Sequence, residues 1–253
     1  MYKTNAISWG KVNRILAGLL GLLLVVLALV GCSDGKPQDG QPGETDLPSQ
    51  GDYNVDWQSY NKVDNLTLLV DEKSGDYVVQ VPGFEDVGDS AGLKMLNSEL
   101  QDEAEDCLEW LRETPESSAC LHVEPYIIET DNTLSIVLFK EEIPDYGTDG
   151  EVESFVYDKL TGYPMDDDLA LAQASITDDD IAVALENYIA ENMNDGVKHR
   201  WREFSDDAFY VDADGKIVMI VEAEISTEGA DDWEYLLLYK DGKIIGKFLD
   251  VIQ

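Results

Sequence analysis

The chain has 253 residues, with 17 basic and 53 acidic side chains and a formal net charge of −36. This acidity argues against nucleic acid and anionic lipid headgroups as ligands, because both are polyanions. It favours cationic proteins, polycationic peptides or divalent metals. The alternative is an acidic surface that only keeps an exported protein soluble.

The N-terminal segment has the pattern of a bacterial lipoprotein signal. Three basic residues precede an apolar run over residues 15–30, which ends in Leu29-Val30-Gly31-Cys32. A basic start, an apolar segment and a small-residue cleavage site are typical of a secretory signal peptide. A cysteine directly after that site predicts that residues 1–31 are removed and that Cys32 carries a diacylglycerol. An uncleaved membrane helix is the alternative, but a run of 16 residues falls short of the roughly 17–25 that a span needs.

The mature protein is expected to be held at the cell membrane by this lipid and to face the extracytoplasmic side. Residues 1–31 hold three basic and no acidic residues, so their removal takes the net charge from −36 to −39. Residues 32–51 are rich in Gly, Pro, Asp, Gln and Ser and are predicted to be a flexible linker. The ectodomain is expected over residues 52–253, as one unit or as two subdomains that meet near residues 160–180.

The first half of the ectodomain is expected to be a hairpin followed by a long helix. Short apolar runs at residues 66–70 and 77–81, joined by Lys73-Ser74-Gly75-Asp76, indicate the hairpin. Apolar residues at spacings of three and four then predict a helix from near Ser90 to near Pro115.

Two cysteines remain besides Cys32. Cys107 is expected on the buried face of the long helix, and Cys120 at the start of the next strand. An even pair in an exported chain favours a disulfide, which would contribute roughly 3 kcal/mol. Two free buried thiols are the alternative. A zinc site is least favoured, because no second cysteine pair exists and the chain has only two histidines.

The rest of the chain is predicted to be mostly strands. Candidates are residues 123–129, 134–140, 152–157, 209–211, 216–223, 234–239 and 244–249. Asp214-Gly215 and Asp241-Gly242 are typical hairpin turns. A second helix is expected from its Thr177 cap, with three aspartates in its first turn. Antiparallel turn chemistry with two main amphipathic helices packed on the sheets predicts an α+β fold.

Two motifs resemble known sites only in part. Residues 88–92, Gly-Asp-Ser-Ala-Gly, are similar to the nucleophile loop of trypsin-like proteases, but no histidine precedes Ser90. A helix cap is the preferred interpretation. Asp212-Ala213-Asp214-Gly215 is similar to a calcium loop, but positions one and twelve would be Tyr210 and Val221 instead of carboxylates. A hairpin turn is preferred.

Three charged clusters need an explanation. Asp166-Asp167-Asp168 and Asp178-Asp179-Asp180 could hold a metal or supply a glycosidase carboxylate pair, but a solvated acidic face or a helix start explains them more simply. Residues 198–202, Lys-His-Arg-Trp-Arg, form the one basic patch. An aromatic residue among bases could contact a sugar or a phosphate, but pairing with surrounding acids is the preferred interpretation. We expect no catalytic residue, no metal site and no cofactor.

From residue 134 onward the chain resembles a known extracytoplasmic domain of unknown function. The sigma-V anti-sigma factor and the N-terminal region of the peptidoglycan deacetylase PdaC share that domain. The matching segments are residues 133–136, 156–162 followed by the acidic start at 165–169, and 204–212 with 215–218. Residues 77–100 fit the upstream half.

The resemblance implies an envelope setting and a fold without catalytic residues. The anti-sigma relative binds lysozyme, a cationic protein, which gives the acidity of this chain a possible purpose by analogy. Family members often carry Gly-Gly-Ala-His in one hairpin, whereas residues 146–150 here read Tyr-Gly-Thr-Asp-Gly. We recognise no deacetylase domain or sigma-binding segment, so neither activity is expected.

The sequence therefore predicts a non-catalytic envelope lipoprotein that binds a wall-derived ligand or a protein, for example a cationic protein of lysozyme type. One alternative is a cell-wall glycan hydrolase that uses a carboxylate pair. Another is a purely structural surface lipoprotein.

Overall fold

The computed structural model describes residues 53, 55–74, 77–113, 121–142, 150–193, 196–228 and 232–252. The predicted signal peptide, Cys32 and the linker lie outside these residues, and so does Cys120. Among the described residues, no helix has the length and apolar character that crossing a membrane requires.

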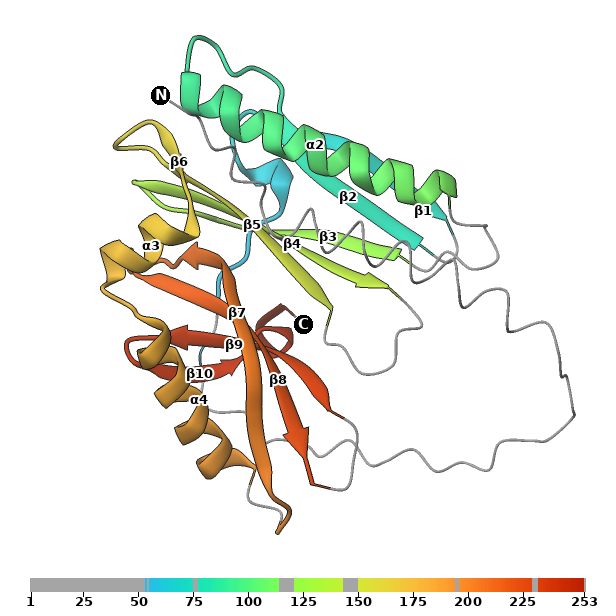
Figure 1. The fold of residues 1–253 in the computed structure, drawn as a ribbon. Coiled ribbons are helices and arrows are strands. Elements are labelled where there is room, and N and C mark those ends of the chain that lie inside the picture. The colour runs from blue at the N-terminus through green and yellow to red at the C-terminus, as the bar shows by residue number, and fades with distance from the viewer. Residues whose placement is uncertain are drawn as a thin grey trace, which may run out of the picture. The chain divides into compact units, whose positions relative to one another are not determined.

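The fold is α+β, as the sequence predicts, with two sheets and two long helices (Figure 1). The elements before the second sheet are η1 (Tyr60–Lys62), β1 (Leu66–Ser74), β2 (Tyr77–Phe84), α2 (Ala91–Glu113), β3 (Leu121–Glu129), β4 (Thr133–Glu142), β5 (Glu151–Asp158), β6 (Tyr163–Met165), α3 (Asp167–Ala174) and α4 (Asp178–Asn192). Those that follow are β7 (His199–Val211), β8 (Ile217–Thr227), β9 (Trp233–Lys240), β10 (Lys243–Lys247) and α5 (Leu249–Ile252).

The first sheet has the order β1-β2-β3-β4-β5-β6, and the second has the order β10-β9-β8-β7. All neighbouring strands are antiparallel except β2 and β3, which are parallel. Helix α2 connects these two parallel strands, as a parallel pair requires a crossover. The predicted hairpin of residues 66–81 is confirmed by the pairing of β1 with β2.

Because successive side chains of a strand point to opposite faces, the buried side chains form three separate clusters. In β4, Ile136 and Leu138 pack in a cluster with α2, whereas Val137 and Phe139 pack with the second sheet. In β8 the same alternation sends Val218 and Ile220 toward the first sheet, and Met219 and Val221 into a cluster with α4. The order of layers is therefore α2, first sheet, second sheet, α4. Both faces of the central strands are buried, which explains their continuous apolar runs.

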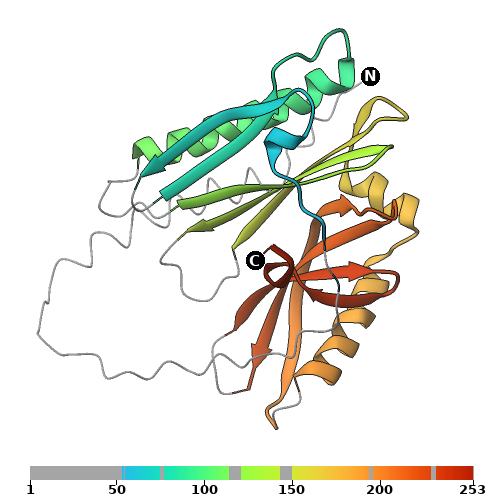
Figure 2. The ribbon, with the colours of Figure 1, turned by 180° about the vertical axis from the view of Figure 1, so that it is seen from behind.

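The N-terminal segment of the described chain runs along this central layer (Figure 2). Trp57 donates from its indole nitrogen to the carbonyl of Val251, 2.9 Å away. Its ring packs against Tyr126, Tyr210 and Phe248 at centroid distances of 5.2–6.1 Å. This aromatic cluster fixes the point at which the chain enters the folded region.

Two predicted boundaries need correction. Strand β7 begins at His199, ten residues before the expected start at Phe209, so the basic patch lies largely within a strand. The last predicted strand, residues 244–249, ends at Lys247, and helix α5 follows from Leu249. Helix α3 begins at the aspartate cluster of residues 166–168, where a helix start is one of the preferred interpretations; the apolar pattern alone does not reveal it, because it buries only Ala170.

Candidate binding pocket between the two sheets

The turns of three hairpins surround one pocket of about 380 Å³. The β3–β4 and β5–β6 turns come from the first sheet, the β7–β8 turn comes from the second, and α3 contributes one side chain. This volume is near the lower end of ligand pockets, which are roughly 300–1,000 Å³. We call it the turn-end pocket. Its lining residues are Thr130, Asp131, Asn132, Thr133, Asp158, Leu160, Met165, Gln173, Val211, Ala213, Asp214, Gly215 and Ile217.

Aspartates at the ends of strands shape two of these turns. Asp158 Oδ1 accepts from the N–H of Leu160 at 2.8 Å, and the Asp158 carbonyl accepts from Gly162 N–H at 2.8 Å. Asp212 Oδ1 likewise accepts from the N–H groups of Asp214 and Lys216, both at 3.0 Å. Such aspartate-to-backbone bonds are a standard way of fixing a turn. The local sequence therefore determines the shape of two walls of the pocket.

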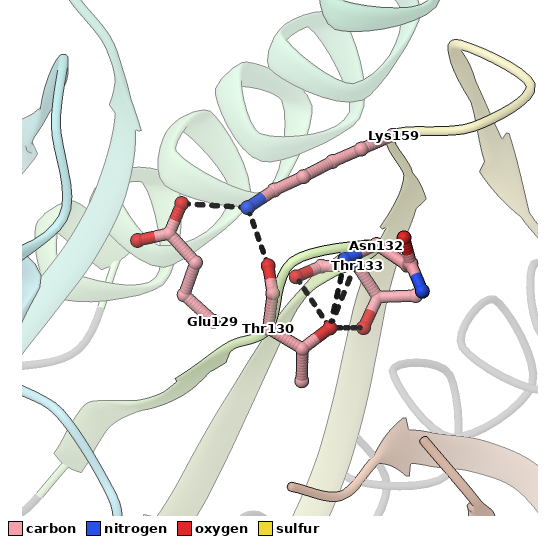
Figure 3. A network of polar contacts seen from close by, with 5 residues as sticks. All are labelled: Glu129, Thr130, Asn132, Thr133 and Lys159. Carbon is pink, nitrogen blue, oxygen red and sulfur yellow. Dashed lines mark hydrogen bonds and ion pairs between the residues drawn. The ribbon is translucent and has the colours of Figure 1, made fainter. Parts of the chain in front are cut away.

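A lysine connects the two turns of the first sheet. Lys159 Nζ donates to Glu129 Oε1 and to the Thr130 carbonyl, both at 2.7 Å (Figure 3). Its backbone N–H also donates to the carbonyl of Asn132 at 2.8 Å. Within the β3–β4 turn, the hydroxyls of Thr130 and Thr133 are 2.8 Å apart. The two turns are thus held together by side-chain and backbone bonds.

Two serines of the first sheet form hydrogen bonds with β7, the strand of the second sheet that leads into the pocket. The Val211 N–H donates to Ser135 Oγ at 3.0 Å, and the Phe209 N–H donates to Ser154 Oγ at 2.9 Å. Phe209 and Val211 belong to β7, an edge strand whose outer N–H groups lack a strand partner. These bonds attach the β7 end of the pocket to β4 and β5.

The charges around the pocket are mainly acidic. Asp131, Asp158 and Asp214 line it. Nearby lysines pair elsewhere: Lys216 with Asp241 at 2.5 Å, and Lys240 with Asp212. In the described parts of the chain, neither Asp131 nor Asp214 forms an ion pair with a lysine or arginine. The pocket therefore combines carboxylate, amide and hydroxyl groups with an apolar wall.

The long helix places Cys107 in the core. In the reduced state that the structure shows, its thiol is buried and Sγ donates to Glu103 Oε1 at 3.3 Å. Burial, and then the Glu103 carboxylate, raise the pKa of this thiol to about 12, so a reduced Cys107 is unreactive in the native protein. Because Cys120 lies outside the described residues, the Cys107–Cys120 disulfide and the alternative of two free thiols both stay predictions.

Both aspartate clusters are helix starts, which is one of the two simpler interpretations of the sequence. Asp166 caps α3 by accepting from Leu169 N–H at 2.8 Å. Thr177 and Asp180 form a capping box at the start of α4. The fold does bring Asp178 and Asp167 toward Asp206 of β7, where burial and these carboxylates raise the Asp206 pKa. Even so, no group of three or more His, Cys, Asp or Glu in the described ranges could hold a metal.

The remaining motifs also have structural explanations. Ser90 Oγ accepts from Leu93 N–H at 3.2 Å, which confirms it as the cap of α2. A Cβ on Gly92 would lie 2.0 Å from the carbonyl oxygen of Gly162, so the second glycine of that motif allows α2 to pack on the β5–β6 turn. Residues 212–215 form the expected hairpin turn instead of a calcium loop, with Gly215 at φ +75°.

Arg202 of the basic patch pairs with acids. Arg202 lies 2.8 Å from Asp232 and 3.5 Å from Glu224, which confirms the expectation for this residue. Trp201 packs against Phe204 in an edge-on arrangement, with ring centroids 5.7 Å apart. The tryptophan is therefore part of the packing under α4.

A buried charge cluster was missed in the sequence. Lys140 Nζ of β4 lies 2.7 Å from Glu103 Oε1 of α2 and 2.8 Å from Glu153 Oε1 of β5. Burial first, and then Glu153, raise the pKa of Glu103 to about 7. Burial alone would lower the pKa of Lys140, but the two glutamates outweigh it and raise that pKa. None of the three residues belongs to an apparent motif, because they are far apart in the sequence.

No family model matches this chain, and no curated protein matches it either. The resemblance to the extracytoplasmic domain of the anti-sigma factor and deacetylase therefore stays a prediction.

Proposed function

We propose that this chain is a bacterial cell-envelope lipoprotein whose ectodomain binds a protein or wall-derived ligand without transforming it. The turn-end pocket is the proposed binding site. Cys32 carries the lipid that holds the protein at the extracytoplasmic side of the membrane, and no cofactor takes part.

One observation carries the proposal: three turns from both sheets converge on a pocket that is fixed by hydrogen bonds at each turn. Binding residues are found disproportionately on loops that a rigid scaffold holds in place. A pocket with a few polar groups set against an apolar wall is the usual form of a ligand site.

Charge supports a cationic partner. The net charge is −39 after residues 1–31 are removed, and the pocket itself is lined by three aspartates. Complementary charge speeds encounter with a basic protein and disfavours anionic ligands. By the resemblance, a protein of lysozyme type is the first partner to test.

A glycan hydrolase is the second candidate, and the Glu103–Glu153 pair is the observation that favours it. A raised carboxyl pKa next to a second carboxylate is typical of a glycosidase acid. Yet Glu103 is only 6% exposed, Lys140 bridges it to Glu153, and neither glutamate lines the turn-end pocket. A substrate could not reach this pair, so we favour binding over hydrolysis.

Titration calorimetry of the full-length lipoprotein in detergent micelles tests the proposal. The partner is lysozyme, and a basic protein of unrelated shape is the control. We expect a saturable complex with lysozyme that weakens with salt and persists at about 0.15 M, where the Debye length is about 8 Å. If both proteins bind alike and both are lost by that salt concentration, the acidity is only a solubility device and the proposal fails.

A further inference from the structure

Leu160 is the most exposed of the large apolar side chains in the described chain, with 76% of its surface accessible. It occupies the tip of the β5–β6 turn and lines the turn-end pocket. Isolated exposed apolar residues are common on protein surfaces. This one is unusual because its turn is rigidly held: Asp158 binds its backbone N–H, and the adjacent Lys159 is bound to the β3–β4 turn.

The pocket beside Leu160 has two kinds of wall. Met165, Val211 and Ile217 give it an apolar floor, since Met165 and Val211 are buried in the core. Asp131 and Asp214 stand on turns from opposite sheets, and both side chains are exposed. A ligand that fits must therefore present an apolar stem and a positively charged end.

Lysine and arginine side chains have this character. Their methylene stems pack along apolar surface while the charged head stays near polar groups. Bonds between a cationic head and a carboxylate are among the stronger hydrogen bonds that proteins form. An ordinary metabolite anion would instead be repelled by the aspartates.

We propose that the turn-end pocket receives a lysine or arginine side chain of the cationic partner protein, between Asp131 and Asp214, while Leu160 packs on an apolar patch beside that residue. This inference rests on the proposed function and specifies its contact surface. It makes the pocket and Leu160 the centre of the interface, with the remaining acidic residues as its rim.

The proposal predicts that charges in the pocket and charges at its rim affect different rate constants of the complex. Rim charges mainly set the rate of encounter, whereas contacts in the desolvated centre set the rate of dissociation. Removing charge from the pocket should therefore shorten the lifetime of the complex. Removing the same charge elsewhere should slow association only slightly.

The first experiment measures surface plasmon resonance of lysozyme on the captured full-length lipoprotein. The pocket variant is the double substitution Asp131→Asn and Asp214→Asn. The matched control is Glu186→Gln and Glu191→Gln, on the exposed side of α4 and outside the pocket. We expect the pocket variant to dissociate at least ten-fold faster and the control to dissociate at the wild-type rate. Leu160→Ser should dissociate at least five-fold faster with little change in association.

Equal dissociation rates for the pocket variant, the Leu160→Ser variant and the control overturn the inference and the assignment of the pocket as the binding site, but they leave the proposed binding of a cationic protein by the ectodomain intact. A second experiment separates the two further, using saturation-transfer NMR with Nα-acetyl-lysine methylamide and its glutamine counterpart as probes. The lysine probe should receive saturation from the wild type and the control, and lose it in the pocket variant. If lysozyme does not bind at all, the proposed partner fails, and the lysine probe alone decides the pocket: no transfer overturns the inference.

Discussion

Ser135 near the start of β4 accepts a hydrogen bond from the backbone N–H of Val211 in β7, with 3.0 Å between Oγ and N. The bond joins the two sheets, and Ser135 is fully buried. An edge strand normally exposes unpaired N–H groups to solvent or to another chain. Here a serine of the other sheet occupies one such group, and the bonded residue lines the turn-end pocket.

We expect Ser135→Ala to lower the free energy of unfolding by about 1–3 kcal/mol, because it leaves a buried N–H without a partner. Urea denaturation of the full-length protein measures this loss. Ser154→Ala is the control: it removes the equivalent bond to the N–H of Phe209, and because Ser154 is only partly buried, water can replace its hydroxyl and the loss should be smaller. Equal losses for the two variants would show that burial does not govern the contribution.

Glu222 of β8 should make the protein less stable as the pH rises. Burial, and then Glu234, Glu151 and Asp207, raise its pKa from 4.5 to about 7. The folded state therefore holds this proton more tightly than the unfolded state. The stabilisation is complete below pH 4.5 and is lost as the pH rises to about 7.

The variant Glu222→Gln removes this titration. We expect it to match the wild type near pH 4.5 and to be more stable by about 1–2 kcal/mol at pH 8, after allowance for solvent screening. Urea unfolding at the two pH values provides the measurement, with Glu186→Gln on the exposed face of α4 as control. A variant that gains nothing at pH 8 would mean that Glu222 ionises normally in the folded protein.

Lys159 should matter more to local order than to overall stability. Its ion pair with Glu129 is partly exposed, with 30% and 33% of the two side chains accessible, and such pairs contribute at most about 1 kcal/mol. We expect Lys159→Met to speed amide hydrogen exchange at Asn132 and Thr133 while the global unfolding midpoint changes little. Lys216→Met, which breaks only the pair with Asp241, should leave exchange in the β3–β4 turn unchanged.

Local signals predicted much of the fold. Thr177 followed by three aspartates marks the start of α4, because the capping box needs an acceptor at both positions. Asp241-Gly242 marks a hairpin, since both residues adopt positive φ. In both cases the residues that predict the feature from the sequence are the same residues that form the helix cap or the turn.

The extent of β7 and the pocket could not be predicted in this way. Residues 198–202 appear as a charged patch, because β7 is an edge strand whose first half is largely exposed. The pocket joins turns that are up to about 85 residues apart in the sequence, and only tertiary bonds such as Ser135–Val211 bring them together. The motifs at residues 158–162 and 212–215 indicated turns, but nothing in them indicated that the turns meet.

The state of Cys107 can be decided by thiol labelling. We predict a Cys107–Cys120 disulfide in the exported protein, which would contribute a few kcal/mol at most. Labelling of the denatured, unreduced protein should then find neither thiol. Labelling of both would show two core thiols, and the high pKa of Cys107 would explain why the native protein resists alkylation.

The anchor provides the last prediction, because the proposed function requires that the protein be exported and held at the membrane. The lipobox at Leu29-Val30-Gly31-Cys32 should direct cleavage before Cys32 and attachment of a diacylglycerol to its thiol. Mass spectrometry of the mature N-terminus should find the lipidated cysteine, and the protein should partition into detergent. The variant Cys32→Ser should lose the lipid and leave the membrane fraction. An unmodified Cys32, or a mature chain that still begins at Met1, would overturn the lipoprotein assignment and leave the turn-end pocket to be explained in another compartment.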